Sequence, residues 1–357
     1  MKPEQKNAAA SKEPSASLLE RAMKPRLEFG RGLLCAHSES WGEALVVTMP
    51  QVWEQAKPLL SELPAHLHFV DSMDRTQVEG VFETLPEAES IIGIGGGMSL
   101  DMAKYAAWRR GLDPLLAPSI ASVDACVTNT IAVREEGRVR YIGFVVPKAV
   151  IVDFELMQKA PANLNRAGIG DLLSIHTGCF DWELAAKKGE VKFEPAAADR
   201  ARALVSELEL MAPEINQVTE KALRWMIEAY ALENELCLQV AHSRPEEGSE
   251  HFFAYNLERR VRKNFVHGEL VCLGALIMSR LQENEPERVE RILAAAGVQY
   301  QPAALGLLRE EVEGALLTLS EYVEEEGLFH SIVNERAITR ELMEPLLAGL
   351  EFGGGGD

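Results

Sequence analysis

SIIGIGGGMSLDMAK, residues 90–104, is the stretch that decides the fold. Its apolar run at 91–94 predicts a buried strand, and the three glycines that follow, Gly95, Gly96 and Gly97, permit a turn without side chains. A helix is predicted over 100–109, with Ser99 and Asp101 placed to cap or charge its start. Free N–H groups at the start of a helix bind anions, so the stretch predicts a site for a phosphate or pyrophosphate.

The spacing of the glycines differs from two common phosphate motifs. Met98 stands where a G-x-G-x-x-G pattern needs its third glycine, and no Gly-Lys-Ser/Thr follows as in a P-loop. The stretch therefore indicates a nucleotide site of another lineage. A tight βα turn without a ligand is the alternative.

The composition is that of an acidic globular protein. Its 357 residues suffice for two domains, and no uninterrupted apolar run reaches the length of a membrane span. A net charge of −19 disfavours nucleic acid and anionic lipid, so we expect neither nucleic-acid binding nor membrane insertion. The five cysteines are far apart without a C-x-x-C pair, which predicts reduced thiols in a cytoplasmic protein.

Strand and helix signals alternate in the first half of the chain. Strands are expected at 44–48, 67–70, 91–94, 115–116 and 149–152, helices at 51–63 and 76–85, and a hairpin at 130–146. Such alternation is typical of a parallel sheet covered by helices on both faces. From residue 161 onward helical periodicity prevails, at 201–210, 220–240, 270–281 and 310–325.

This change of character predicts the domains. A dinucleotide-binding α/β domain with a Rossmann-like parallel sheet is expected over 26–160, and an all-α domain over 161–352. Residues 1–25 lack the apolar core of a signal peptide and are expected to form a disordered tail, as are 353–357. We expect a ligand in the cleft between the two domains.

Three residues of the second half have the chemistry of a metal site. Asp171, His251 and His267 each lie near a glycine. The two histidines are 16 residues apart, about 160° out of phase on one helix, so the chain must break between them, at 262–265. One carboxylate and two imidazoles are typical of an open, catalytic divalent site for zinc, iron or nickel. The alternative is that each histidine is an ordinary polar residue, which we expect of the other six.

Together these segments resemble the iron-containing alcohol dehydrogenase and dehydroquinate synthase superfamily. The resemblance covers nearly the whole chain after the tail and is carried by the glycine turn, by PSIASVDA at 118–125 and by the segments around the three candidate ligands. Within the polyol dehydrogenase branch, SRP at 243–245, EH at 250–251 and HGE at 267–269 most resemble glycerol-1-phosphate dehydrogenases. SIASVD at 119–124 is closer to glycerol dehydrogenase.

The resemblance implies a dehydroquinate synthase-like fold and a set of site residues. The pyrophosphate of NAD or NADP would lie on Gly95, Gly96, Gly97, Met98, Ser99 and Asp101, with Ser119, Ser122 and Thr128 near the nicotinamide. One divalent metal, zinc first with nickel or iron as alternatives, would be held by Asp171, His251 and His267. Asp124 would hold a substrate hydroxyl and completes the predicted catalytic set.

The implied reaction interconverts dihydroxyacetone phosphate and sn-glycerol 1-phosphate. Oxidation of glycerol or another polyol is the nearest alternative, a cyclising lyase like dehydroquinate synthase is the alternative of another class, and a relative without activity is the third. Candidates for contact with a phosphate are Arg244, Arg262 and Lys263, which flank the ligand segments. By analogy we also expect a homo-oligomer.

The residues after the first expected strand bear on the choice between NAD and NADP. Met49-Pro50-Gln51 follows this strand and offers no carboxylate for the hydroxyls of the adenosine ribose. A 2′-phosphate would meet no charge repulsion there, so we expect NADP to be accepted.

Overall fold

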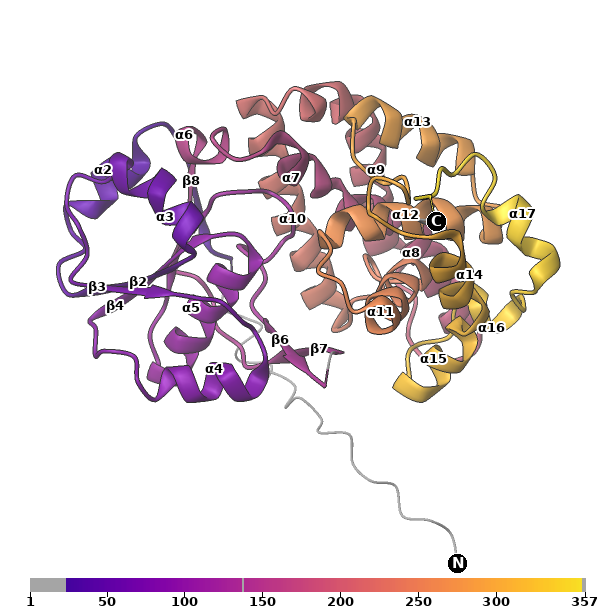
Figure 1. Ribbon diagram of the computed structural model, residues 1–357, viewed down its shortest axis with the longest axis horizontal. Coiled ribbons are helices and arrows are strands. Elements are labelled where there is room, and N and C mark those ends of the chain that lie inside the picture. The colour runs from indigo at the N-terminus through magenta and orange to yellow at the C-terminus, as the bar shows by residue number, and fades with distance from the viewer. Residues whose placement is uncertain (1–23, 137, 355–357) are drawn as a thin grey trace, which may run out of the picture.

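The computed structural model describes residues 24–136 and 138–354, which form an α/β half and a helical half side by side (Figure 1). This arrangement confirms the predicted architecture of a parallel sheet followed by an all-helical part. Most of the two predicted tails, residues 1–23 and 355–357, lies outside the described residues. The predicted domain boundary at 160–161 falls between α6 (Phe154–Met157) and α7 (Ala162–Ala167) and stays a prediction.

Six parallel strands form the sheet of the α/β half. They are β1 (Arg26–Gly30), β2 (Ala44–Thr48), β3 (His66–Phe69), β4 (Ser90–Gly95), β5 (Leu115–Pro118) and β8 (Ala149–Asp153), in the order β1-β8-β5-β4-β2-β3. All residues of β2 and β8 are buried, as expected for strands covered on both faces. Strand β1 was not predicted, because at the sheet edge its charged Arg26 and Glu28 interrupt the apolar pattern.

The order of the strands places a crevice between β2 and β4. From β2 the chain continues to β3 on one side and then returns to β4 on the other, so the direction of winding changes between β2 and β4. In open parallel sheets ligands bind at the carboxyl ends of the strands at such a point. Here those ends are Thr48 and Gly95, and the glycine turn follows directly.

The remaining helices of this half are α2 (Leu33–Ser38), α3 (Pro50–Ala56), α4 (Arg75–Phe82) and α5 (Gly97–Arg110), with the 3-10 turn η1 (Lys57–Leu59). Helix α5 begins three residues before the predicted start. Gly96 occupies its N-cap position and no side chain caps it, so the prediction that Ser99 or Asp101 caps this helix is wrong.

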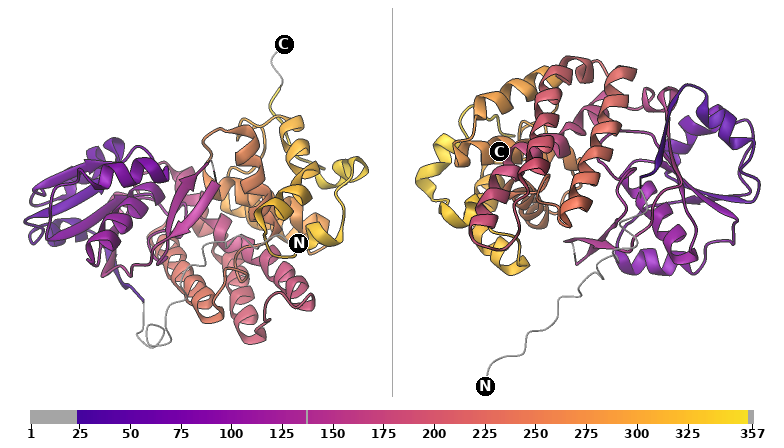
Figure 2. Two further views of the ribbon diagram at one scale, coloured as in Figure 1. Left: turned by 90° about the horizontal axis from the view of Figure 1, so that it is seen from below. Right: turned by 180° about the vertical axis from the view of Figure 1, so that it is seen from behind.

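A hairpin outside the main sheet connects the two halves. Strands β6 (Ile131–Glu135) and β7 (Arg138–Ile142) pair antiparallel, as predicted, and reach from the α/β half toward the helical half (Figure 2). Arg134 donates to Glu258 of the helical half at 3.1 Å. Arg138 and Arg140 bind Glu326 at 2.9 Å and 3.1 Å.

The helical half packs around two helices that are buried over most of their length, α8 (Ile169–Lys187) and α12 (His267–Gln282). Around them lie α9 (Pro195–Asn216), α10 (Glu220–Val240), α11 (Ser249–Val261), α13 (Pro286–Ala296), α14 (Arg309–Leu317), α15 (Leu319–Glu326), α16 (Ile332–Glu335), η2 (Arg340–Leu342) and α17 (Met343–Leu346). The segment 310–325, predicted as one helix, is two helices that break at Thr318.

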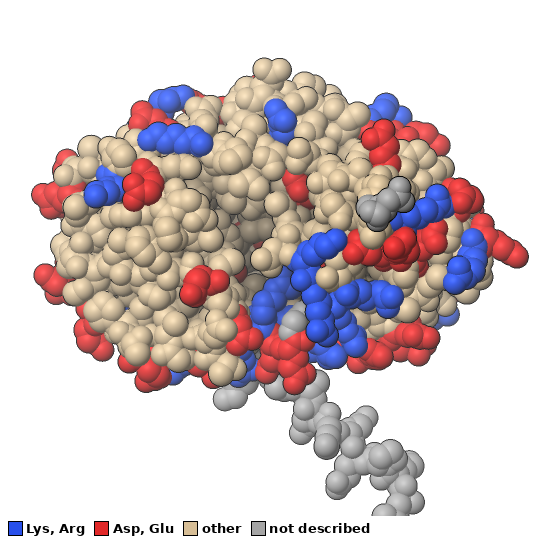
Figure 3. Space-filling view, viewed as in Figure 1, with Lys and Arg blue, Asp and Glu red and all other residues tan. Residues whose placement is uncertain are grey.

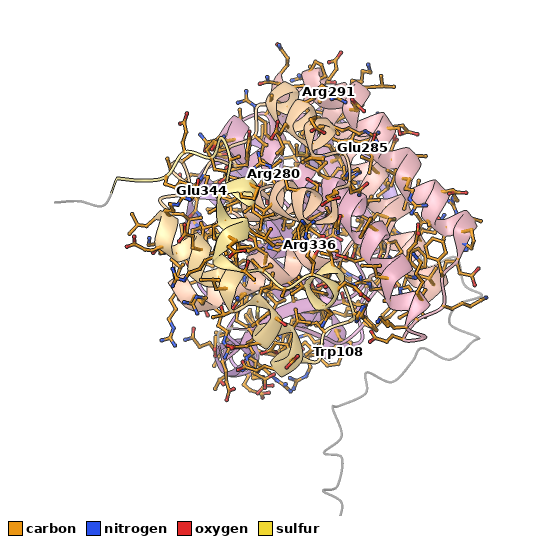
Figure 4. The ribbon with its side chains drawn as sticks, turned by 90° about the vertical axis from the view of Figure 1, so that its right-hand side faces the viewer. Trp108, Arg280, Glu285, Arg291, Arg336 and Glu344 are labelled. Atoms are coloured by element: carbon orange, nitrogen blue, oxygen red, sulfur yellow. The ribbon has the colours of Figure 1, made fainter. Side chains whose placement is uncertain are left out.

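Figure 4 views the end of this half, where Arg280 and Arg336 are labelled. Arg280 donates to the carbonyl of Leu346 at 2.7 Å, and Arg336 donates to that of Leu281 at 2.8 Å. Within the described part of the chain, no helix has the length and apolar character needed to span a membrane.

A buried lysine, ion-paired within α5, joins this helix to the loop after β5. Lys104 is fully buried, and its Nζ lies 2.7 Å from Asp101 Oδ1 and 2.7 Å from the carbonyl oxygen of Thr130. It also donates to Thr128 Oγ1 at 3.2 Å. The lysine therefore fixes the loop 119–130 to the helix that starts at the glycine turn.

Replacing Lys104 by Met should lower the free energy of unfolding by about 3–5 kcal/mol, because a buried carboxylate at Asp101 loses its cation. Chemical denaturation measures the loss. The double variant Lys104→Met/Asp101→Asn removes both charges and should recover part of it. Equal losses in the two variants would contradict this role of the pair.

Candidate active site

Two glycines allow α8 and α12 to touch backbone to backbone. A Cβ atom on Gly170 would lie 2.5 Å from the carbonyl oxygen of Gly268, and a Cβ atom on Gly268 would collide with the carbonyl oxygen of Ala167. Asp171 follows the first glycine and His267 precedes the second. The crossing of the two helices thus brings one predicted ligand from each to the same place.

The third predicted ligand comes from α11. This helix ends at Val261, Arg262 turns the chain with φ 55°, and α12 begins at His267, so the chain breaks where the spacing of the histidines predicted. The Nε2 atoms of His251 and His267 each lie 3.9 Å from Asp171 Oδ1. One ligand atom from each of the three residues lies within 4.8 Å of the others. Asp171 and His251 are buried, whereas the side chain of His267 is 25% exposed.

The electrostatics of this cluster fit a cation. Asp171 Oδ1 is buried and has no hydrogen-bond partner, while Oδ2 accepts the N–H of Asp124 at 3.3 Å. Burial raises the pKa of Asp171 to about 6. Burial and the charge of Asp171 raise the pKa of Asp124 to about 7. One carboxylate oxygen and two imidazole nitrogens form a donor set that divalent transition metals prefer, so the residues fit the predicted metal.

Replacing Gly170 by Ala should force α8 and α12 apart, because the added Cβ would meet backbone that cannot move aside. We expect a loss of about 1–3 kcal/mol in stability and a weaker metal site. Denaturant midpoints and metal content after dialysis measure the two effects. Gly80→Ala in α4, where a Cβ meets nothing within 4 Å, is the matched control: it should leave the metal content unchanged and, because alanine is the better helix former, should raise stability slightly. Wild-type metal content in Gly170→Ala would contradict the role of this contact.

Glu250 orients the metal ligand next to it. Its Oε1 lies 2.9 Å from His251 Nδ1 and accepts the N–H of Gly248 at 2.6 Å, and its Oε2 accepts the hydroxyl of Thr177 at 2.6 Å. Burial raises the pKa of Glu250, but the hydrogen bond and charge of His251 outweigh burial and hold it below its usual value. An ionised Glu250 keeps a proton on Nδ1 of His251, so that Nε2 carries the free lone pair.

Glu250→Gln should weaken metal binding by about 10-fold to 100-fold, because the neutral amide no longer selects this tautomer. Competition with a chromophoric chelator measures the affinity without any assay of turnover. Thr177→Val removes the hydrogen bond to Oε2 of Glu250 and leaves the charge and the bond to Oε1 from Gly248 in place, so its effect should be smaller. An affinity in Glu250→Gln equal to that of the wild type would exclude this role.

The glycine turn offers unpaired polar groups at the crevice between β2 and β4. Gly95 has φ 153°, and a Cβ there would lie 2.5 Å from Ser99 Oγ, so only glycine fits. The N–H groups of Gly97, Met98 and Ser99 are the first of α5 and have no acceptor within it. The hydroxyls of Ser99 and Thr48 are buried without partners. These free donors at a helix start fit the predicted pyrophosphate.

The segment after β5 joins the turn to the metal cluster. Ser119 donates its N–H to the carbonyl of Gly95 at 2.9 Å, and both Ser119 and Ser122 are buried. A Cβ on Gly97 would lie 3.2 Å from the side chain of Val123, and the neighbouring Asp124 binds Asp171 through its N–H. This segment therefore contacts both predicted sites.

Two predicted cofactor contacts have other partners as well. The carboxylate of Asp101 is engaged by Lys104, and Thr128 accepts from the same lysine through its carbonyl and hydroxyl oxygens. Contact of these two residues with the cofactor stays a prediction.

The structure also sorts the predicted phosphate candidates. Arg244 is fully buried, its guanidinium lies 5.8 Å and 5.6 Å from the rings of Phe252 and Phe329, and its nitrogens have no hydrogen-bond partner among the described residues, so its contact with a phosphate stays a prediction. Lys263 donates to the carbonyl of Gly306 at 3.0 Å and to Glu311 at 3.3 Å. Arg262 remains exposed.

Sequence reasoning missed three residues around the metal cluster. Tyr255 stacks on His267 with ring centroids 6.0 Å apart, and its spacing of four residues from His251 on one helix could have revealed it. The orienting role of Glu250 could not be read from the sequence, since adjacent residues do not share a helix face. Lys104 carried no signal beyond helical periodicity.

Comparison with known proteins agrees with this geometry. The sequence profile described as "Iron-containing alcohol dehydrogenase" matches residues 26–161. Glycerol-1-phosphate dehydrogenase [NAD(P)+] of Aeropyrum pernix is 31% identical over 258 residues, 72% of each chain. The protein of that name from Hyperthermus butylicus is 32% identical over 259 residues, again 72% of each chain.

Solved structures share the fold. A probable glycerol dehydrogenase from Sinorhizobium meliloti 1021 superposes with a TM-score of 0.68 at 23% identity, over 91% of this chain and 96% of that one. Glycerol dehydrogenase from Schizosaccharomyces pombe gives a TM-score of 0.67 at 21% identity, over 91% and 89%.

This combination is typical of one class of oxidoreductases: an α/β half carries a glycine turn, and a helical half carries an Asp-His-His cluster. The chain belongs to the iron-containing alcohol dehydrogenase family, on the branch of the glycerol-1-phosphate dehydrogenases. The predicted resemblance and the predicted fold are thereby confirmed.

Proposed function

We propose that the protein is a metal-dependent, NAD(P)-linked dehydrogenase that interconverts dihydroxyacetone phosphate and sn-glycerol 1-phosphate. The observation that carries the proposal is the convergence of Asp171, His251 and His267 beside a segment that also touches the glycine turn. In this arrangement a metal-bound substrate and a dinucleotide would lie at the two ends of one short segment. The names of the relatives support the substrate.

The residues divide the work of the reaction between binding and orientation. Asp171, His251 and His267 would hold the metal, and the amides at the start of α5 would hold the pyrophosphate. When bound, the metal supplies Lewis acidity at the substrate oxygen, and the dinucleotide gives or takes the hydride. Glu250 would fix the tautomer of His251, and the ring of Tyr255 stacks on His267 and would restrict its rotation. The carboxylate of Asp124 would accept a hydrogen bond from a substrate hydroxyl.

The donor set also supports a choice of metal and cofactor. Two imidazoles and one carboxylate suit zinc, with nickel or iron as alternatives, and we propose zinc. Met49 follows β2 as the N-cap of α3, and no carboxylate stands there to repel a 2′-phosphate. We therefore propose that the enzyme accepts NADP as well as NAD, which a comparison of KM values for the two dinucleotides tests directly.

Location and assembly complete the proposal. The five cysteines are free, which fits a reducing compartment, and we propose that the protein acts in the cytoplasm. The family resemblance supports a homo-oligomer, whose size light scattering on the purified protein measures.

Asp171→Asn and His251→Ala should each lower kcat with dihydroxyacetone phosphate by about 1,000-fold or more, because each removes a ligand of the metal. The change in NAD(P)H absorbance measures turnover, with dihydroxyacetone and glycerol as the competing substrates. Fluorescence titration should show NAD(P)H affinity within about twofold of the wild type, since the glycine turn is untouched.

His66→Ala on the edge strand β3 is the control and should keep full activity. Turnover that survives in Asp171→Asn or His251→Ala would contradict the ligand assignment. Faster turnover of glycerol than of the phosphorylated substrates would instead favour the glycerol dehydrogenase alternative.

A further inference from the structure

Basic side chains gather beside the hollow between the two halves of this acidic protein (Figure 3). They come from the hairpin and from the end of α11, and the set comprises Arg134, Arg138, Arg140, Arg259, Arg260, Arg262 and Lys263. The chain has a net charge of −19, yet it concentrates cations at one cleft. Their positive potential would attract an anion to this cleft.

Most of these cations are already neutralised. Arg138 and Arg140 share Glu326, whose side chain is only 3% exposed, and Arg259 pairs with Glu325 at 2.8 Å. Two differ. Arg134 binds Glu258 through Nη1 at 3.1 Å, which leaves Nε and Nη2 free for another acceptor. The exposed Arg262 forms no ion pair with any acid in the described part of the chain.

Arg262 directly follows α11, and Arg134 of β6 is held by Glu258 on that helix, on the face that starts at the metal cluster. His251, Tyr255, Glu258 and Arg262 follow at intervals of four, three and four residues, which places them within about 60° of one another around the helix. Tyr255 stacks on the metal ligand His267. Glu258, which binds Arg134, lies about 4.5 Å further along the helix axis than Tyr255.

The electrostatics agree with this placement. The carboxylates on the other side of this site would repel a phosphate group. The carboxylates of Glu250 and Asp171 lie 2.9 Å and 3.9 Å from the ring nitrogens of His251, and Asp124 lies beside Asp171. A dianion bound at the metal would be directed away from these carboxylates and toward the arginines.

We propose that Arg134 and Arg262 bind the phosphate group of a triose or glycerol phosphate whose oxygens occupy the metal site. Guanidinium groups suit this task, since their planar donors pair with two phosphate oxygens at once. Arg134 comes from the α/β half and Arg262 from the helical half, so the phosphate would join the two. This inference rests on the proposed function and names the residues that select its phosphorylated substrate.

Steady-state kinetics of Arg134→Gln and Arg262→Gln with dihydroxyacetone phosphate and with dihydroxyacetone test it. In each variant KM for the phosphorylated substrate should rise about 10-fold, while kcat/KM for dihydroxyacetone stays within about twofold. Inorganic phosphate, as a competitive inhibitor of the wild type, should lose potency in parallel. Arg140→Gln removes the same charge from the same hairpin but pairs with Glu326, so it is the matched control and should change neither constant.

The outcomes separate this inference from the proposed function. Wild-type turnover of dihydroxyacetone phosphate with arginine variants that behave like Arg140→Gln would overturn the phosphate site alone. An equal rise in KM for both substrates would also overturn it, because the arginines would then act on the site as a whole. A wild type that does not turn over dihydroxyacetone phosphate would overturn the proposed function and this inference with it.

Discussion

The bare contact between Gly170 and Gly268 is the constraint on which the site depends. A side chain at Gly170 would separate α8 from α12, and with them the carboxylate of Asp171 from the imidazole of His267. A side chain at Gly268 would instead meet the carbonyl oxygens of Ala167 at the end of α7 and of Ser122. Both helices are buried along almost their whole length, so the packing of the helical half holds this crossing in place. A metal site built on such a crossing is preorganised, since its ligands need not move to converge.

The loop after β5 connects the metal cluster to the α/β half of the molecule. Lys104 ties the loop to α5, the N–H of Ser119 binds Gly95, and the N–H of Asp124 binds Asp171. The glycine turn and the metal cluster are therefore connected through one segment of about ten residues. The hairpin adds a second connection, through ion pairs from its arginines to Glu258 and Glu326. Both connections cross the cleft in which the substrate would lie.

Local sequence patterns were enough to predict the sheet, the glycine turn and the break between the two histidines. Each of these features depends on a short stretch of the sequence. Strand β1 was not predictable from its own pattern, since an edge strand carries charges where a central strand carries apolar residues. The start of α5 was misplaced because glycine is a poor helix former, yet the anion site needs it in the first turn. The family resemblance identified the metal ligands, whereas the residues that hold these ligands in place could not be predicted. The pairings of Glu250 with His251, Lys104 with Asp101 and Arg134 with Glu258 depend on side-chain directions and on contacts between distant segments.

The central claim is that Asp171, His251 and His267 bind one divalent cation. An anomalous-scattering map of crystals grown from protein with its metal content determined by elemental analysis tests it most directly. The account predicts one ion per chain, located between Asp171 Oδ1 and the Nε2 atoms of the two histidines. Fully active protein that contains no divalent metal, or an ion bound elsewhere in the chain, would contradict it.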